Sequence, residues 1–150
     1  MRYAVANAQN DPGDTDLGMA YGIVTSSGPC TLTATFASSL GHQMIVHDVS
    51  GLATTDPLDA SSTMAYGDAS DPFTSGTSTT SMDGDYIFGY EGGGSNLPMT
   101  AGSGFTLEAT DIGSNAEDMI QPTAGPVSAS FTPGSSFPFT AGMMGFKPEE

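Results

Sequence analysis

The sequence predicts an all-β chain, an antiparallel β-sandwich or jelly roll with long loops rich in Ser, Thr and Gly. Three observations support this. Runs of alternating apolar and polar residues recur at intervals of roughly 8–15 residues. Turn-forming residues separate these runs, with 20 Gly and 10 Pro in 150 residues. No segment carries an apolar stripe at helical spacing over three turns. This combination is typical of two packed antiparallel sheets.

We predict that residues 83–90 contain the central strand of this fold. A tight acidic turn at Asp83-Gly84 leads into a run of β-forming residues. Tyr86, Phe88 and Tyr90 fall on one face, and Ile87 falls on the other. A strand that is apolar on both faces requires cover on both sides, so this strand should lie inside the sheet.

Before this strand, the pattern predicts an N-terminal arm or loop over residues 1–18, with a possible short strand at residues 3–6, followed by one domain over residues 19–150. Residues 19–24 and 31–36 alternate cleanly and are joined by a Ser-Gly-Pro turn, so we expect them to form a hairpin. Residues 43–49 predict a third strand. The other predicted strands cover residues 62–66, 77–81, 105–109, 117–121 (strand or helical turn), 127–132 and 137–146, where Gly142 and Gly145 permit a bulge.

The charge balance excludes two classes of partner. Lys and Arg total 2 against 17 Asp and Glu, which gives a formal charge of −15. Two cations cannot form the basic patch that a nucleic acid requires. The same shortage argues against docking on anionic lipid. An electrostatic partner should therefore be cationic or bridged by metal ions.

Other sequence features limit the remaining classes. Cys30 is the single cysteine, so no internal disulfide forms, and we expect it to be a partly buried strand residue. No apolar run reaches the ~18 residues that a transmembrane helix needs. The first residues turn polar too soon for a signal peptide, so we expect no general secretory export.

The sequence offers little chemistry. There is no Gly-x-Ser-x-Gly motif, and His47 and Asp48 are strand neighbours that should diverge, so we predict no catalytic residues and no enzyme. No cofactor is expected, with Ca²⁺ as the one exception. Asp11, Asp14 and Asp16 bracket a turn and could bind it together with backbone carbonyls, although their spacing differs from that of an EF-hand. Solvated turn acids are the alternative.

Six phrases occur in a familiar order, and these are residues 21–36, 47–59, 83–89, 100–106, 117–121 and 146–148. Across roughly residues 19–148 the chain resembles a β-sandwich domain family of bacterial secreted and surface proteins and of phage structural proteins. The resemblance carries no catalytic motif. It implies that further strands precede the first matched phrase, and that a neighbouring subunit would cover the sheet edge left without them.

We therefore expect a non-enzymatic structural virion protein, most simply a phage head decoration or cement protein that binds the major capsid protein or another virion protein and forms a dimer or trimer. The alternative is a carbohydrate- or surface-binding module of a secreted or adhesive bacterial protein, located outside the cell or on its surface, with a glycan as ligand. Apolar residues near the two ends of the chain are candidates for subunit contacts or for the core, and these are Tyr3, Val5, Phe137, Phe139, Met143, Met144 and Phe146.

Overall fold

The fold was determined as a computed structural model of the 150-residue chain. The structure describes residues 4–10, 16–36, 43–61, 65–68, 72–93, 98–111, 113–135 and 137–150.

Thirteen strands and no helix occur in these ranges. The strands are β1 (Ala4–Asn10), β2 (Asp16–Tyr21), β3 (Leu58–Ser61), β4 (Ala65–Asp68), β5 (Phe73–Thr74), β6 (Ser78–Thr79), β7 (Asp85–Gly92), β8 (Met99–Ala101), β9 (Thr106–Asp111), β10 (Ser114–Gln121), β11 (Pro126–Val127), β12 (Ser130–Pro133) and β13 (Pro138–Phe146). Every recorded strand pair is antiparallel. The predicted all-β antiparallel class is confirmed, and the sandwich and jelly-roll assignments stay predictions.

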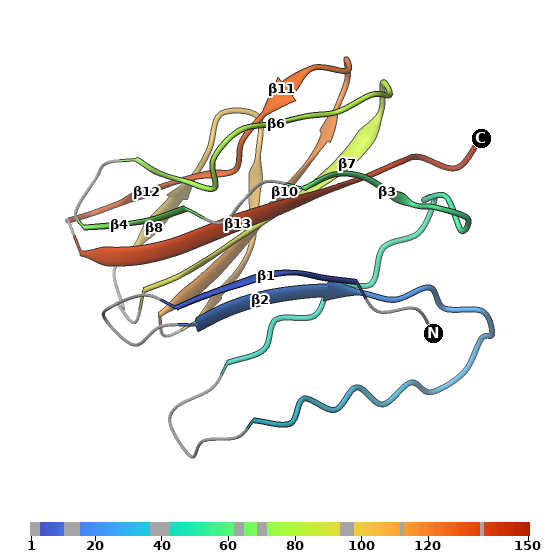
Figure 1. The fold of residues 1–150 in the computed structure, drawn as a ribbon, viewed down its shortest axis with the longest axis horizontal. Helices are drawn as coiled ribbons and strands as arrows, with labels where there is room; N and C mark the ends of the chain where they lie inside the picture. Colours follow the sequence, from blue (N-terminus) through green and yellow to red (C-terminus); the bar gives the residue numbers. More distant parts are fainter. Residues whose placement is uncertain are drawn as a thin grey trace.

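A six-stranded sheet organises the molecule. Its order is β3-β13-β7-β10-β9, and β4 pairs with a further part of β13. Three smaller groups accompany it, namely the hairpin β1-β2, the pair β11-β6 and the three-stranded group β5-β12-β8. In Figure 1, β1 and β2 lie below β13, whereas β6, β11 and β12 lie above it.

The prediction that residues 83–90 contain the central strand is confirmed. β7 is hydrogen-bonded on one side to β10 and on the other to β13. Gly84, with φ of 87°, makes the turn that leads into it, a conformation that favours glycine. Successive side chains then enter different cores, since Ile87 belongs to one apolar cluster and Tyr86 to another.

The two clusters lie on opposite faces of the central sheet. The first joins the sheet to the smaller strands and has as its buried members Phe73, Ile87, Ala129, Phe131, Phe139, Ala141 and Met143. The second joins it to the β1-β2 hairpin and has as its buried members Leu17, Met19, Tyr86, Met144 and Phe146. Phe73 anchors the first cluster because its ring stacks on Phe139, with centroids 4.0 Å apart and planes 7° apart.

β13 supplies residues to both clusters. It begins at Pro138, where a missing backbone N–H is tolerated. The register with β3 shifts between Gly145 and Phe146, but the extra residue is Asp59 of β3. From Thr140 to Phe146, β13 pairs with β7 without a shift, so the bulge predicted for this strand is not found there. A side chain at Gly145 would crowd its neighbours, since a Cβ there would lie 3.2 Å from Ile87 Cδ1.

The predictions for residues 19–49 need correction. The hairpin of residues 19–24 with 31–36 is wrong, because β2 pairs with β1 instead. Residues 31–36 and 43–49 belong to no strand. The alternating pattern was present in both segments, but neither joins a ladder with the described strands. Residues 1–18, expected as an arm or loop with a possible short strand at residues 3–6, contain β1 at Ala4–Asn10 and the start of β2.

Elsewhere the expectations were closer. β6, β9 and β13 fall within or across the ranges predicted for them. Residues 117–121 belong to β10, a full strand, because pairing with β7 and β9 on both sides overrides the weak β-propensity of Ala, Glu and Asp. Residues 127–132 are split between β11 and β12.

Candidate functional site

Residues 22–36 and 43–50 carry the most unusual surface of the described chain. They hold five of the six large apolar side chains that are exposed among the described residues, and these are Val24 (66% exposed), Leu32 (43%), Phe36 (49%), Met44 (55%) and Val46 (54%). Exposed apolar side chains that gather in one region mark interaction sites more often than scattered ones do.

The backbone of this region is also free of strand pairing. None of the described residues 22–36 and 43–50 belongs to a β-ladder. Figure 1 shows residues 22–36 running as an extended chain at the outer margin of the molecule. Residues 31–36 are exposed at every position. The apolar side chains of Leu32 and Phe36 are therefore 43% and 49% exposed.

Most of this region carries no formal charge, since Asp48 is its single charged residue. From Leu17 to His47 the sequence contains no Asp, Glu, Lys or Arg, although the whole chain has 19 such residues. We call residues 17–47 the neutral segment. In a chain with a formal charge of −15, it is the longest stretch along which another acidic surface could approach without direct charge repulsion.

The two parts of the region differ in how they are held. His47 lies edge-on to Phe88, with ring centroids 4.7 Å apart, and Val49 packs on the second apolar cluster. Ser114 Oγ donates a hydrogen bond to Gln43 Oε1 at 2.5 Å. Residues 43–50 are thus anchored to the central sheet, and residues 31–36 stand away from it.

The candidates for subunit contacts belong mostly to the core. Phe139, Met143, Met144 and Phe146 are 0–8% exposed within the single chain, so they are not available to a partner. Their alternation along β13 sends them into the two clusters. Of the two alternatives given for these residues, the core is the one that describes these four.

The other residues singled out in the sequence are Phe137, Val5, Tyr3 and Cys30. Phe137 is partly buried and lies edge-on to Phe73, with centroids 4.9 Å apart, so it extends the first cluster. Val5 lies in β1, of which the structure describes the backbone, and Tyr3 lies outside the described residues. Cys30, expected to be partly buried on a strand, is exposed.

Three buried carboxyl groups form a second feature, which the sequence analysis missed. Asp85 and Glu91 lie on the same face of β7 as Ile87, and Glu117 projects from β10 opposite Gly89. All three are 0–1% exposed. No local sequence signal marks them, because their burial depends on the strands that cover that face.

Asp85 forms a pair with Asp59 of β3. Neither carboxyl oxygen of Asp85 accepts a hydrogen bond from a donor in the described structure. Burial, followed by the hydrogen bond and negative charge of Asp59, raises the pKa of Asp85 to about 7, and Lys147 partly offsets this. Asp85 therefore keeps its proton to a higher pH than an exposed aspartate does.

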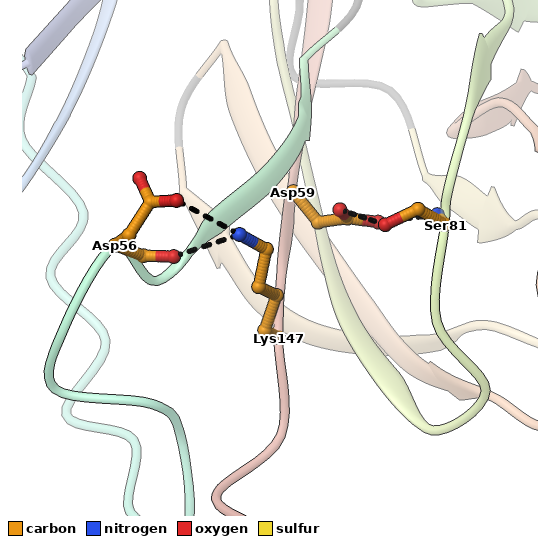
Figure 2. Close-up of polar contacts among 4 residues, drawn as sticks. All are labelled: Asp56, Asp59, Ser81 and Lys147. Carbon is orange, nitrogen blue, oxygen red and sulfur yellow. Dashed lines mark hydrogen bonds and ion pairs between the residues drawn. The ribbon is translucent and has the colours of Figure 1, made fainter.

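Asp59 is fixed by Ser81. Its two carboxylate oxygens accept hydrogen bonds from the Ser81 hydroxyl and the Ser81 backbone N–H, each at 2.5 Å. Burial acts to raise the pKa of Asp59, but these hydrogen bonds outweigh it and the pKa is lowered. Figure 2 shows this contact beside the ion pair of Lys147 with Asp56.

Glu117 and Glu91 differ in how many of their carboxylate oxygens accept a hydrogen bond. Glu117 accepts hydrogen bonds from the backbone N–H groups of Gly102 at 2.7 Å and Ser130 at 2.8 Å. Burial still raises its pKa. Glu91 accepts a hydrogen bond from Asn115 through Oε1, while Oε2 has no partner in the described structure, and burial raises its pKa to about 7.

A pocket of about 650 Å³ lies next to the Asp56–Lys147 ion pair. Lys147 Nζ contacts the Asp56 carboxylate at 3.1 Å and donates to its carbonyl at 3.0 Å. Glu149 and Glu150 also line the pocket. Because carboxylates outnumber the lysine, the pocket favours a cationic group over an anionic one.

The described residues hold no assembled metal site. No group of three or more His, Cys, Asp or Glu within them is arranged to bind a metal ion. Asp11 and Asp14 lie outside the described residues, and Asp16 begins β2. Calcium binding at that turn stays a prediction.

No family model, curated protein or solved structure matches this chain.

The described ranges also contain no helix long and apolar enough to cross a membrane. The functional interpretation therefore depends on the neutral segment and the buried carboxyls. The buried carboxyls are closed to solvent and act inside the fold. Within the neutral segment, residues 24–36 are exposed to solvent.

Proposed function

We propose that this chain is a non-enzymatic structural protein that works by fitting against other protein surfaces. Within that class we favour a phage virion protein, a head decoration or cement protein that binds the capsid lattice and associates with its own copies.

One observation carries the proposal. Exposed apolar side chains gather on residues 22–36 and 43–50, where the backbone has no strand partner. Exposed apolar surface is costly in a protein that acts alone in water, because it promotes association. A protein that is covered by its neighbours in an assembly removes this cost.

The finer assignment to a virion depends on two further points. The phrases described above resemble a domain family that includes phage structural proteins. The formal charge of −15 keeps free copies apart in solution, so that the neutral segment is left as the place where contact is tolerated. A decoration protein needs this combination, because it must stay soluble until it meets the capsid.

Immunoelectron microscopy tests the location. An antibody against the purified protein would be applied to intact particles and to cells of the source culture. We expect label on the heads of phage particles. Label confined to cell surfaces or to secreted material would contradict the virion proposal and favour the surface-binding alternative.

A glycan array with the purified chain tests that alternative directly. Sugar stacking needs an accessible aromatic face, but Tyr86 is 6% exposed and its hydroxyl donates to Asp118 at 2.9 Å. We therefore expect no specific glycan. Specific sugar binding by a monomeric protein would overturn the structural role.

A further inference from the structure

We propose that Asp59 and Asp85 form a binding site for a Ca²⁺ ion, together with the hydroxyl of Ser81 and water. This site lies apart from the exposed surface that carries the proposed function. Three features of the structure support it, namely the position of the two carboxyl groups, the burial of the Asp85 oxygens without a donor, and the access from solvent along Ser81.

The strand order β3-β13-β7 brings the two carboxyl groups together. Phe146 of β13 pairs with Leu58 of β3 on one side and with Tyr86 of β7 on the other. Asp59 follows the first of these partners in sequence, and Asp85 precedes the second. Asp59 is also the extra residue where β3 bulges, and a bulge redirects a side chain. The two side chains lie within hydrogen-bonding reach of each other, so a cation between them would contact both.

The carboxyl group of Asp85 is buried without a donor. Asp85 is 0% exposed, and neither of its carboxyl oxygens accepts a hydrogen bond from the described part of the chain. Folded proteins seldom leave a buried carboxyl group in this state, because the water that it loses is not replaced. Glu117 is equally buried but accepts two backbone N–H groups. A cation bound to Asp85 would supply the contact that Glu117 obtains from the backbone.

The atoms that surround the proposed ion are oxygens, which Ca²⁺ prefers. Both carboxylate oxygens of Asp59 accept hydrogen bonds from Ser81 at 2.5 Å, and each retains a further lone pair. The Ser81 hydroxyl also keeps its lone pairs while it donates. No group of three or more His, Cys, Asp or Glu is placed for a metal in the described ranges, so water must complete the roughly six to eight ligands of Ca²⁺. Mg²⁺ suits the pair less well, because it requires near-ideal octahedral geometry.

The pair is open to solvent on one side. Asp59 is half-buried and Ser81 is exposed, and the pocket of about 650 Å³ extends to Ser81. Lys147 is near enough to act on both carboxyl groups through its charge. Figure 2 shows its amine turned toward Asp56, whereas the Asp59 carboxylate points toward Ser81. The lysine therefore does not occupy the position proposed for the ion.

Calorimetric titration of the full chain with CaCl₂, after removal of metal with EDTA, tests the site. Ca²⁺ should bind, and at about 100 times its Kd it should raise the Tm by roughly 5–10 °C. Asp85→Asn keeps the side-chain volume but removes a charged ligand, so it should weaken binding at least about tenfold. Glu91→Gln is the matched control, since Glu91 is 1% exposed on the same strand, and it should leave the Kd within about twofold.

Two further variants separate this site from the acidic turn near the N-terminus. Asp59→Asn should weaken binding as Asp85→Asn does, whereas Asp14→Asn should leave the Kd unchanged. Circular dichroism should show that each variant keeps the strand content of the wild type. No binding at up to about 10 mM Ca²⁺, which exceeds the Kd of the weakest extracellular calcium modules, would overturn the proposal. Binding that survives both Asp59→Asn and Asp85→Asn would overturn it as well.

A crystal structure of the wild-type chain grown with CaCl₂ gives a test that does not depend on the stability of any variant. We expect one ion in contact with Asp59 and Asp85, and an ion found only elsewhere would contradict the site. The two proposals fail separately. A chain that labels phage heads but binds no Ca²⁺ would end the calcium site and leave the virion role. A chain that binds Ca²⁺ at this pair but is absent from particles would do the opposite.

Discussion

The Oε1 atom of Glu117 accepts a hydrogen bond from the backbone N–H of Ser130 at 2.8 Å, and this contact joins the central sheet to β12. Oε2 accepts the N–H of Gly102 in the same way at 2.7 Å. One buried carboxylate thus satisfies two backbone donors that would otherwise lie unpaired between the sheets.

Replacing Glu117 should loosen this junction. Glu117→Gln keeps the shape but leaves one N–H facing an amide N–H₂, so we expect the free energy of unfolding to fall by about 1–3 kcal/mol. Urea unfolding followed by circular dichroism measures the change. Glu108→Gln on the exposed face of β9 is the control and should change it by less than about 0.5 kcal/mol. Equal effects of the two variants would contradict the role of Glu117.

Stability should fall as the pH rises through the neutral range. The pKa of Asp85 and of Glu91 is raised to about 7 in the folded chain, from ordinary values of 3.8 and 4.5. The folded chain therefore binds protons that the unfolded chain has released, so the free energy of unfolding falls between about pH 4 and about pH 7 and levels off above about pH 8.

Urea unfolding at pH 5, 6, 7 and 8 measures this dependence. The double variant Asp85→Asn with Glu91→Gln removes both titrating groups at nearly constant volume, so its stability should vary less over this range. The lowered pKa of Asp59 acts below its ordinary value of 3.8, outside the tested window. A stability that rises from pH 5 to pH 8 would contradict the burial of the two acids.

Gly89 should not tolerate a side chain. A Cβ at this position would overlap the Cβ of Ala129 and lie 3.1 Å from Glu117 Cγ. Gly89→Ala should therefore lower the free energy of unfolding by about 1–3 kcal/mol through overpacking. Gly18→Ala in β2 is the control, because nothing lies within 4 Å of a Cβ there. Thermal unfolding of both variants would compare them, and equal loss would argue against the close approach.

Met143 should contribute to the stability of the fold and not to association between copies. Met143 is 0% exposed in the first apolar cluster, and Met143→Ala should lower the free energy of unfolding by about 2–5 kcal/mol without changing the solution mass. A change in mass on mutation of Met143 would place it at an interface after all.

Part of this molecule could be predicted from local pattern. The alternation of Tyr86, Ile87 and Phe88 correctly predicted a strand covered on both faces. Residues 31–36 show the limit of the method. Their alternation is as regular as that of β7, but they join no sheet, because a ladder also needs a partner that the local sequence does not name.

The local sequence also could not predict which carboxyl groups are buried. Asp59 and Asp85 lie 26 positions apart in sequence, and the strand order β3-β13-β7 brings them to one place. The sequence by itself determined the strand class, the acidic character and the uncharged run, since these follow from residue types and period-two alternation. Only the tertiary structure decided which strands are paired, which acids are enclosed and which apolar residues face solvent. These features depend on contacts between residues far apart in the chain, and such contacts leave no local trace.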